Sequence, residues 1–86
     1  MAELVEENRY ETNQTVVAAY LVYMGLDLVD QVWENGVCTF FFEQSKDLER
    51  SLLAFVSGKA RVEPQSFNNS FVQVRSRMFK AKEQSK

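Results

Sequence analysis

The chain has 86 residues and a formal net charge of -2, with ten Lys and Arg against twelve Asp and Glu, one cysteine and no histidine. This length suits one small domain, and 45% apolar residues with 13% aromatics exclude a disordered chain. The missing histidine and the lone cysteine exclude Ser-His-Asp and Cys-His catalysis, zinc sites built with histidine and internal disulfides, so we expect no enzyme, no cofactor and no bound metal.

The first predicted element is a helix that is apolar on every side. Thr12 or Asn13 is expected to cap its start, and Gly25 supplies the left-handed residue that ends it. The apolar side chains between them, at helical spacing and on the remaining faces, are Val17, Ala18, Ala19, Tyr20, Leu21, Val22 and Met24. A helix without a polar side is buried at the centre of a fold or in an oligomer.

Asn35-Gly36 lies between two segments rich in β-branched and aromatic residues and predicts a type I′ hairpin with strands Leu28–Glu34 and Val37–Glu43. With a two-residue turn, Glu34 faces Val37 and Val29 faces Phe42. The face expected to join the core consists of Val29, Gln31, Trp33, Cys38, Phe40 and Phe42. The opposite face is still apolar around Val32 and Phe41, so either a helix covers it or a partner binds it.

Two more helices are predicted after the hairpin. Ser45 caps the first, Gly58 ends it, and its apolar stripe is Leu48, Leu52, Phe55 and Val56. Residues 59–63 form an extended connector or a third strand. Pro64 begins the last helix, which runs to about Lys82. Its apolar stripe is Phe67, Phe71, Val74, Met78 and Ala81, and Val72 and Phe79 form a second stripe roughly 130° away.

The element order helix, hairpin, helix, link, helix predicts one small α+β domain over residues 12–82, with helices packed on an antiparallel sheet. Residues 1–11 and 83–86 are predicted to be mobile tails. The acidic start of the chain differs from a secretion signal, and the longest nearly uncharged stretch, about 15 residues, is too short to span a bilayer. We therefore expect a cytoplasmic protein without a membrane partner.

The charges divide along the chain. Residues 1–58 hold ten acidic against three basic side chains, or -7, and residues 59–86 hold seven basic against two acidic, or +5. Basic residues of this kind bind nucleic-acid phosphates, and the candidates are Lys59, Arg61, Arg75, Arg77, Lys80 and Lys82. On a helical wheel, however, the bases of the last helix flank its apolar stripe on both sides, which is typical of a helix that packs on a core. A nucleic-acid-binding regulator is therefore the alternative hypothesis.

Apolar residues that the core does not obviously absorb favour protein association. The candidate interface residues are Val32, Phe41, Val72 and Phe79. A two-fold homodimer would cover such surface, and two-fold dimers are the commonest oligomers. The same residues need no partner if they close a tight monomeric core. We expect a small accessory protein that acts by binding another protein or a second copy of itself.

Three segments carry a family resemblance. They are Ala18-Ala19-Tyr20-Leu21-Val22 leading to Gly25, Thr39-Phe40-Phe41-Phe42-Glu43, and Phe55-Val56-Ser57-Gly58-Lys59-Ala60-Arg61-Val62-Glu63-Pro64 before Phe67. An AAYL helix, an aromatic strand and a GxARVxP link in this order resemble a family of short uncharacterised domains from bacteriophages and bacterial mobile elements. The resemblance covers about residues 10–79. It implies a bacterial cytoplasmic setting, no assigned activity and no functional residues to carry over.

Overall fold

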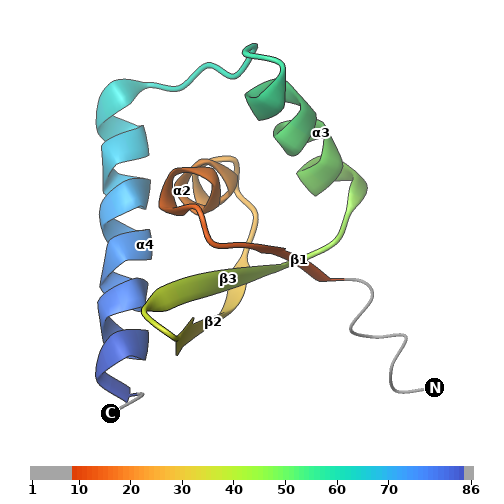
Figure 1. Cartoon of the computed structure of the whole chain (residues 1–86). Helices are drawn as coiled ribbons and strands as arrows, with labels where there is room; N and C mark the ends of the chain where they lie inside the picture. Colours follow the sequence, from red (N-terminus) through yellow and green to blue (C-terminus); the bar gives the residue numbers. More distant parts are fainter. Residues whose placement is uncertain (1–8, 85–86) are drawn as a thin grey trace, which may run out of the picture.

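A three-stranded antiparallel sheet carries α2 on one face, with α3 and α4 on either side of α2 (Figure 1). The structure is a computed structural model that describes residues 9–84. Its elements are β1 (Arg9–Thr12), α2 (Thr15–Tyr23), β2 (Leu28–Glu34), β3 (Val37–Glu43), α3 (Lys46–Val56) and α4 (Pro64–Gln84). The α+β class and the predicted order of helix, hairpin, helix and helix are confirmed.

The predicted hairpin is confirmed in its bounds and in its turn. Asn35 and Gly36 have φ angles of 55° and 79°, the positive values that a type I′ turn requires. The predicted register holds from the turn to the pair Asp30 and Phe41.

At its first residues β2 departs from the predicted register. A bulge between Leu28 and Asp30 makes Leu28 the partner of Phe42, where Val29 was expected. One extra residue in a strand reverses the alternation of side chains beyond it. Leu28 therefore packs against the core, and Val29 is 40% exposed. The placement of Val29 on the core face was wrong for this reason.

The third strand comes from residues predicted to be a tail. In β1, Arg9 pairs with Glu43 and Thr12 with Phe40, so β3 becomes the central strand of the order β1-β3-β2. Pairing with β1 satisfies the second backbone edge of β3, which the hairpin alone leaves open. The four residues of β1 are too few for a recognisable alternation, and residues 59–63 form no strand. Residues 1–8, the rest of this tail, lie outside the described residues.

The C-terminal boundary also moves. Helix α4 continues through residues 83 and 84, which were predicted to belong to a tail, and residues 85–86 lie outside the described part of the chain.

Helix α2 is enclosed on all its sides over its central residues, as its composition predicts, although Val16 in the first turn is 41% exposed. Residues 17–21 are all buried, which requires cover on every face of the helix. The cap differs from the prediction: Gln14 is the N-cap and makes no side-chain cap bond, while the Thr12 hydroxyl accepts a hydrogen bond from the Gln14 amide at 3.1 Å. Gly25, with φ of 92°, follows the helix end as expected.

The core forms where every other element meets α2. Its largest fully buried side chains are Phe40 and Phe42 of β3, Leu21 of α2, Leu48 of α3 and Val74 of α4. The sheet and each of the three helices therefore contribute at least one side chain to a single cluster.

Helix α3 begins at the predicted cap, where the Ser45 hydroxyl accepts a hydrogen bond from the Leu48 amide at 3.1 Å. Leu48 is fully buried, and the Phe55 ring lies 5.5 Å from the Tyr20 ring. Val56, one residue and about 100° further around the helix, points away from α2 and is 79% exposed. Its place in the predicted core stripe was wrong.

Helix α4 begins at Pro64, as predicted, and Glu63 caps it. The Glu63 carboxylate accepts hydrogen bonds from the Ser66 amide at 2.8 Å and from the Gln65 amide at 3.1 Å. These bonds, first the one from Ser66, lower the pKa of Glu63. The Glu63 amide donates to the Tyr23 hydroxyl at 3.0 Å, so the same residue also ties the connecting link to α2.

The two α3 residues from the predicted stripe should differ sharply in their effect on stability. Leu48→Ala is expected to lower the free energy of unfolding by about 2–5 kcal/mol because it leaves a cavity in the core. Val56→Ala, on the same helix, should change it by less than about 0.5 kcal/mol because its side chain is exposed. Urea denaturation of the two variants measures the difference, and equal losses would contradict this account of α3.

The Glu63 cap should make stability depend on pH. Because folding lowers the pKa of this carboxyl, the stabilisation is fully present above the unfolded value of about 4.3 and is lost as the pH falls through the lower folded value. We expect Glu63→Gln to be less stable than the wild type at neutral pH and equally stable once the carboxyl is protonated. An NMR titration of Glu63 checks the direction, and a pKa at or above the ordinary value would contradict it.

Candidate functional site

One side of α4 carries an exposed apolar stripe. Val72 and Phe79 are 55% and 48% exposed and lie two turns apart, on the side of the helix away from the buried Val74. The Arg75 guanidinium lies 5.6 Å from the centre of the Phe79 ring. Val72, Arg75, Ser76 and Phe79, here called the α4 outer face, line a shallow hollow of about 240 Å³. The second stripe predicted for this helix thus faces solvent.

The second candidate pair lies on the face of the sheet turned away from α2, here called the sheet outer face and defined by Val32, Val37, Thr39 and Phe41. Val32 is 41% exposed, and the Arg9 guanidinium lies 5.8 Å from the centre of the half-buried Phe41 ring. Within residues 9–84 no helix covers this face. The four predicted interface residues therefore do not share one surface. Val32 and Phe41 lie on the sheet, whereas Val72 and Phe79 lie on α4.

The predicted nucleic-acid residues do not gather either. Lys59 and Arg61 lie in the link before α4. Arg75, the first basic residue within α4, is eleven residues beyond Pro64, or about 16 Å along the helix axis. Within α4, Arg75 stacks on Phe79, and the Lys82 ammonium lies 5.5 Å from the centre of the Trp33 ring. The six bases are thus divided between the link, which holds two of them, and different sides of α4, which holds four.

Arg77 connects α4 to the sheet. Its Nε donates to Oε1 of Gln31 at 2.9 Å, and its Nη2 donates to the Leu28 carbonyl at 3.2 Å. Arginine has five N–H donors, so part of the guanidinium remains available. No carboxylate of residues 9–84 forms an ion pair with Arg77. A half-buried positive charge is therefore held in place by neutral acceptors only.

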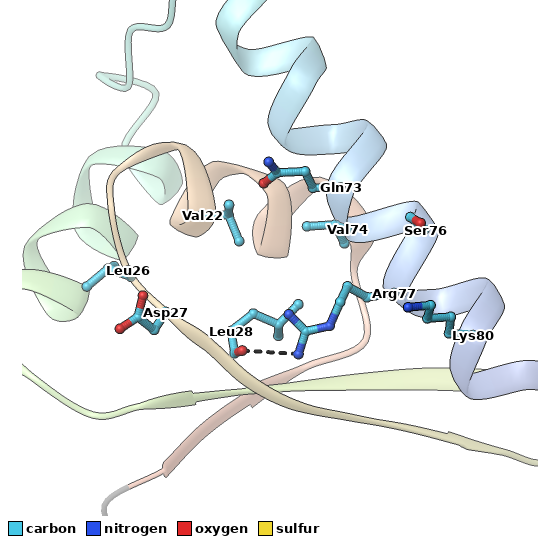
Figure 2. Close-up of a pocket in the computed structure, with 9 residues that line it drawn as sticks. All are labelled: Val22, Leu26, Asp27, Leu28, Gln73, Val74, Ser76, Arg77 and Lys80. Carbon is cyan, nitrogen blue, oxygen red and sulfur yellow. Dashed lines mark hydrogen bonds between the residues drawn. The ribbon is translucent and has the colours of Figure 1, made fainter. Parts of the chain in front are cut away.

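This guanidinium lies in a groove between α4 and the start of β2, here called the α4–β2 groove (Figure 2). The groove has a volume of about 520 Å³. Its apolar lining is Val22, Leu26, Leu28 and Val74, and its polar lining is Asp27, Gln73, Ser76, Arg77 and Lys80. Figure 2 shows Asp27 on the side of the connecting loop and the two cations on the side of α4. The groove is therefore apolar in the middle, positive along one wall and negative at the other.

Sequence reasoning did not find this groove, although one signal was present. Gln31 was placed on the core face of the hairpin, and a buried amide needs a hydrogen-bond partner. The partner, Arg77, is 46 residues away along the chain. Only the packing of α4 along β2 brings the two together, so no local pattern could identify the pair.

The lone thiol lies apart from these surfaces. Cys38 is 5% exposed and faces Trp33 across the hairpin, as predicted. Burial raises the pKa of the Cys38 thiol, which keeps it in the protonated form. Among the residues that the structure describes, no three Cys, Asp or Glu side chains cluster as metal ligands. None of the helices described is both long enough and apolar enough for a transmembrane segment.

Comparison with protein families finds a match to the Domain of unknown function (DUF5659) over residues 7–80. The match spans nearly the same residues as the motifs named above and confirms that they mark an uncharacterised domain. Neither the curated proteins nor the solved structures include a match to the chain.

The two arginines of α4 should differ in their effect on stability. Arg77→Ala is expected to lower the free energy of unfolding by about 1–3 kcal/mol, because it removes two charge-assisted hydrogen bonds and leaves Gln31 without a partner. Arg75→Ala, the matched control, removes only an exposed stacking contact, for which we expect less than about 1 kcal/mol. Urea denaturation measures both, and an equal cost would contradict the structural role of Arg77.

Proposed function

The chain belongs to the DUF5659 family of domains of unknown function, and on that premise we propose that it is a small non-enzymatic protein that acts by protein binding, as a homodimer formed through the α4 outer face. One observation carries the proposal: Val72 and Phe79 stay half exposed although the core is closed by other side chains. Contiguous exposed apolar surface marks interaction sites, and these two side chains line one hollow on α4.

The α4 outer face is suited to pair with a copy of itself. In a two-fold interface the same patch is used by both subunits, so it must carry both a projection and a recess. Phe79 supplies the projection, and the hollow beside Ser76 supplies the recess. An antiparallel pairing of two α4 helices, with the axis between Arg75 and Ser76, sets Val72 of each copy against the partner's Phe79.

A bacteriophage or mobile-element origin and a cytoplasmic location belong to the same proposal. They are supported by the resemblance of the AAYL helix, the aromatic strand and the GxARVxP link, in that order along the chain. In such a setting the domain acts as an accessory protein that binds another protein and catalyses no reaction.

Nucleic-acid binding remains the alternative function. Its support is the excess of seven basic over two acidic side chains after residue 58. Against it, the six bases are divided between the link and different sides of α4, and the sheet outer face is bordered by the carboxylates of Glu11, Asp30, Glu34 and Glu43. The alternative requires salt-dependent retention of DNA that decreases when Arg75 and Arg77 are both replaced by Ala.

The mass in solution tests the homodimer. We expect light scattering at micromolar concentration to give twice the chain mass of 10.0 kDa, and Phe79→Asp to give the monomer mass because it removes the apolar ring and places a carboxylate, which is costly to desolvate, at the interface. Val56→Asp, at a more exposed apolar position on α3, is the matched control and should remain dimeric. A wild-type mass of 10.0 kDa at every concentration would overturn the homodimer.

A further inference from the structure

We infer that the α4–β2 groove is a binding site for the carboxylate end of a peptide whose last side chain is apolar. The inference concerns a surface other than the proposed dimer interface, since the two share only Ser76 among their lining residues. It rests on the charges of the groove, its apolar floor and its lack of aromatic side chains.

The positive wall of the groove favours an anionic ligand. Arg77 and Lys80 lie one turn apart on α4, and both line the groove. Two neighbouring cations repel each other, and neither has an ion-pair partner among residues 9–84. The hydrogen bonds to Gln31 and Leu28 fix the plane of the Arg77 guanidinium and leave its Nη1 without a partner in this part of the chain. A guanidinium held in this way is preorganised for a carboxylate.

The apolar floor of the groove favours a ligand in which an apolar group is attached to that anion. Val22, Leu26 and Leu28 come from α2, the loop after it and β2, and these three half-buried side chains meet in the groove, while Val74 of α4 lies at the groove but is fully buried. A volume of about 520 Å³ lies within the range of sites that hold small ligands or short peptide segments. A free inorganic anion would leave this apolar floor in contact with water, so the ligand must carry both groups.

A peptide end fits the groove better than a nucleic acid does. Sequence-tolerant nucleic-acid sites stack bases on aromatic side chains, and none of the nine residues that line the groove is aromatic. Asp27 at the opposite wall would repel a phosphate backbone, whereas it accepts a hydrogen bond from a peptide N–H. With the carboxylate at Arg77 and Lys80, the last side chain of the peptide lies on the floor and the preceding amide faces Asp27.

The test uses the smallest molecule that carries these groups. The full-length chain, labelled with ¹⁵N, is titrated by NMR with N-acetyl-L-leucine and, as the matched control, with N-acetyl-L-leucinamide. For a ligand of this size we expect a dissociation constant on the order of millimolar for the acid. The shifts should be confined to amides of α4 and of residues 22–28. The amide should bind at least tenfold more weakly because it lacks the negative charge.

Two charge reversals locate the site. Lys80→Glu is expected to weaken the binding of N-acetyl-L-leucine about tenfold, since the exposed Lys80 side chain contacts the carboxylate and has no part in the core. Lys59→Glu makes the same charge change in the link before α4 and should leave the affinity unchanged. Phe79→Asp should leave it unchanged as well, which separates failure of the groove from failure of the dimer.

Three outcomes of these titrations, and a fourth from a phosphate control, would overturn the inference. The first three are equal binding of the acid and the amide, equal binding to the wild type and Lys80→Glu, and no saturable shift at concentrations an order of magnitude above the expected dissociation constant. Inorganic phosphate is titrated in parallel. If phosphate shifts the same amides with the same affinity as N-acetyl-L-leucine, the floor contributes nothing and the assignment to a peptide end is wrong.

Discussion

The burial of α2 is the constraint on which the rest of the structure depends. Residues 17–21 are apolar and buried without interruption, so every side of the helix is covered along this stretch, while Val16 in its first turn is 41% exposed. The small side chains of Ala18 and Ala19, both fully buried, allow neighbouring elements to approach the helix backbone closely. In a chain of 86 residues, covering all of these sides takes the inner face of the sheet, α3 and α4 together (Figure 1).

The sheet, α3 and α4 each use one side to cover α2, so their opposite sides face solvent. The sheet keeps one face in solvent, and α4 keeps the stripe that contains Val72 and Phe79. Antiparallel sheets commonly leave one face solvated, and the sheet outer face is polar enough at its rim to remain so. The α4 outer face presents its two exposed apolar side chains on one helix, beside a hollow, and the proposed association is placed there.

Polar contacts hold α4 at its first turn and again in its second half, at Arg77. Glu63 caps its first turn and binds the Tyr23 hydroxyl through its amide, while Arg77 binds Gln31 and the Leu28 carbonyl. These bonds hold the helix in one position against α2 and β2. The α4–β2 groove results from this position, since it lies where the bulged start of β2 and the loop after α2 leave the surface of α4 uncovered.

Local chemistry was sufficient to predict most of the elements. Asn35-Gly36 specifies the turn of the hairpin, Ser45 and Pro64 specify two helix starts, and an apolar run of helical spacing specifies a buried α2, because each of these preferences acts within a few residues. Local chemistry could not predict the features that depend on residues far away along the chain. The strand β1 exists because β3 has an open edge, and Val29 leaves the core because of a bulge.

The same division applies to the candidate sites. The helical period of α4 places Val72 and Phe79 on a second stripe, so the sequence predicts that stripe, while their exposure depends on what packs against α4. The separation of the two apolar pairs, the engagement of Arg77 by Gln31 and the groove beside them arise only when α4 packs along β2. The reason is physical: periodicity specifies which side of an element is apolar, and the position of one element on another depends on side-chain packing between residues far apart in the chain.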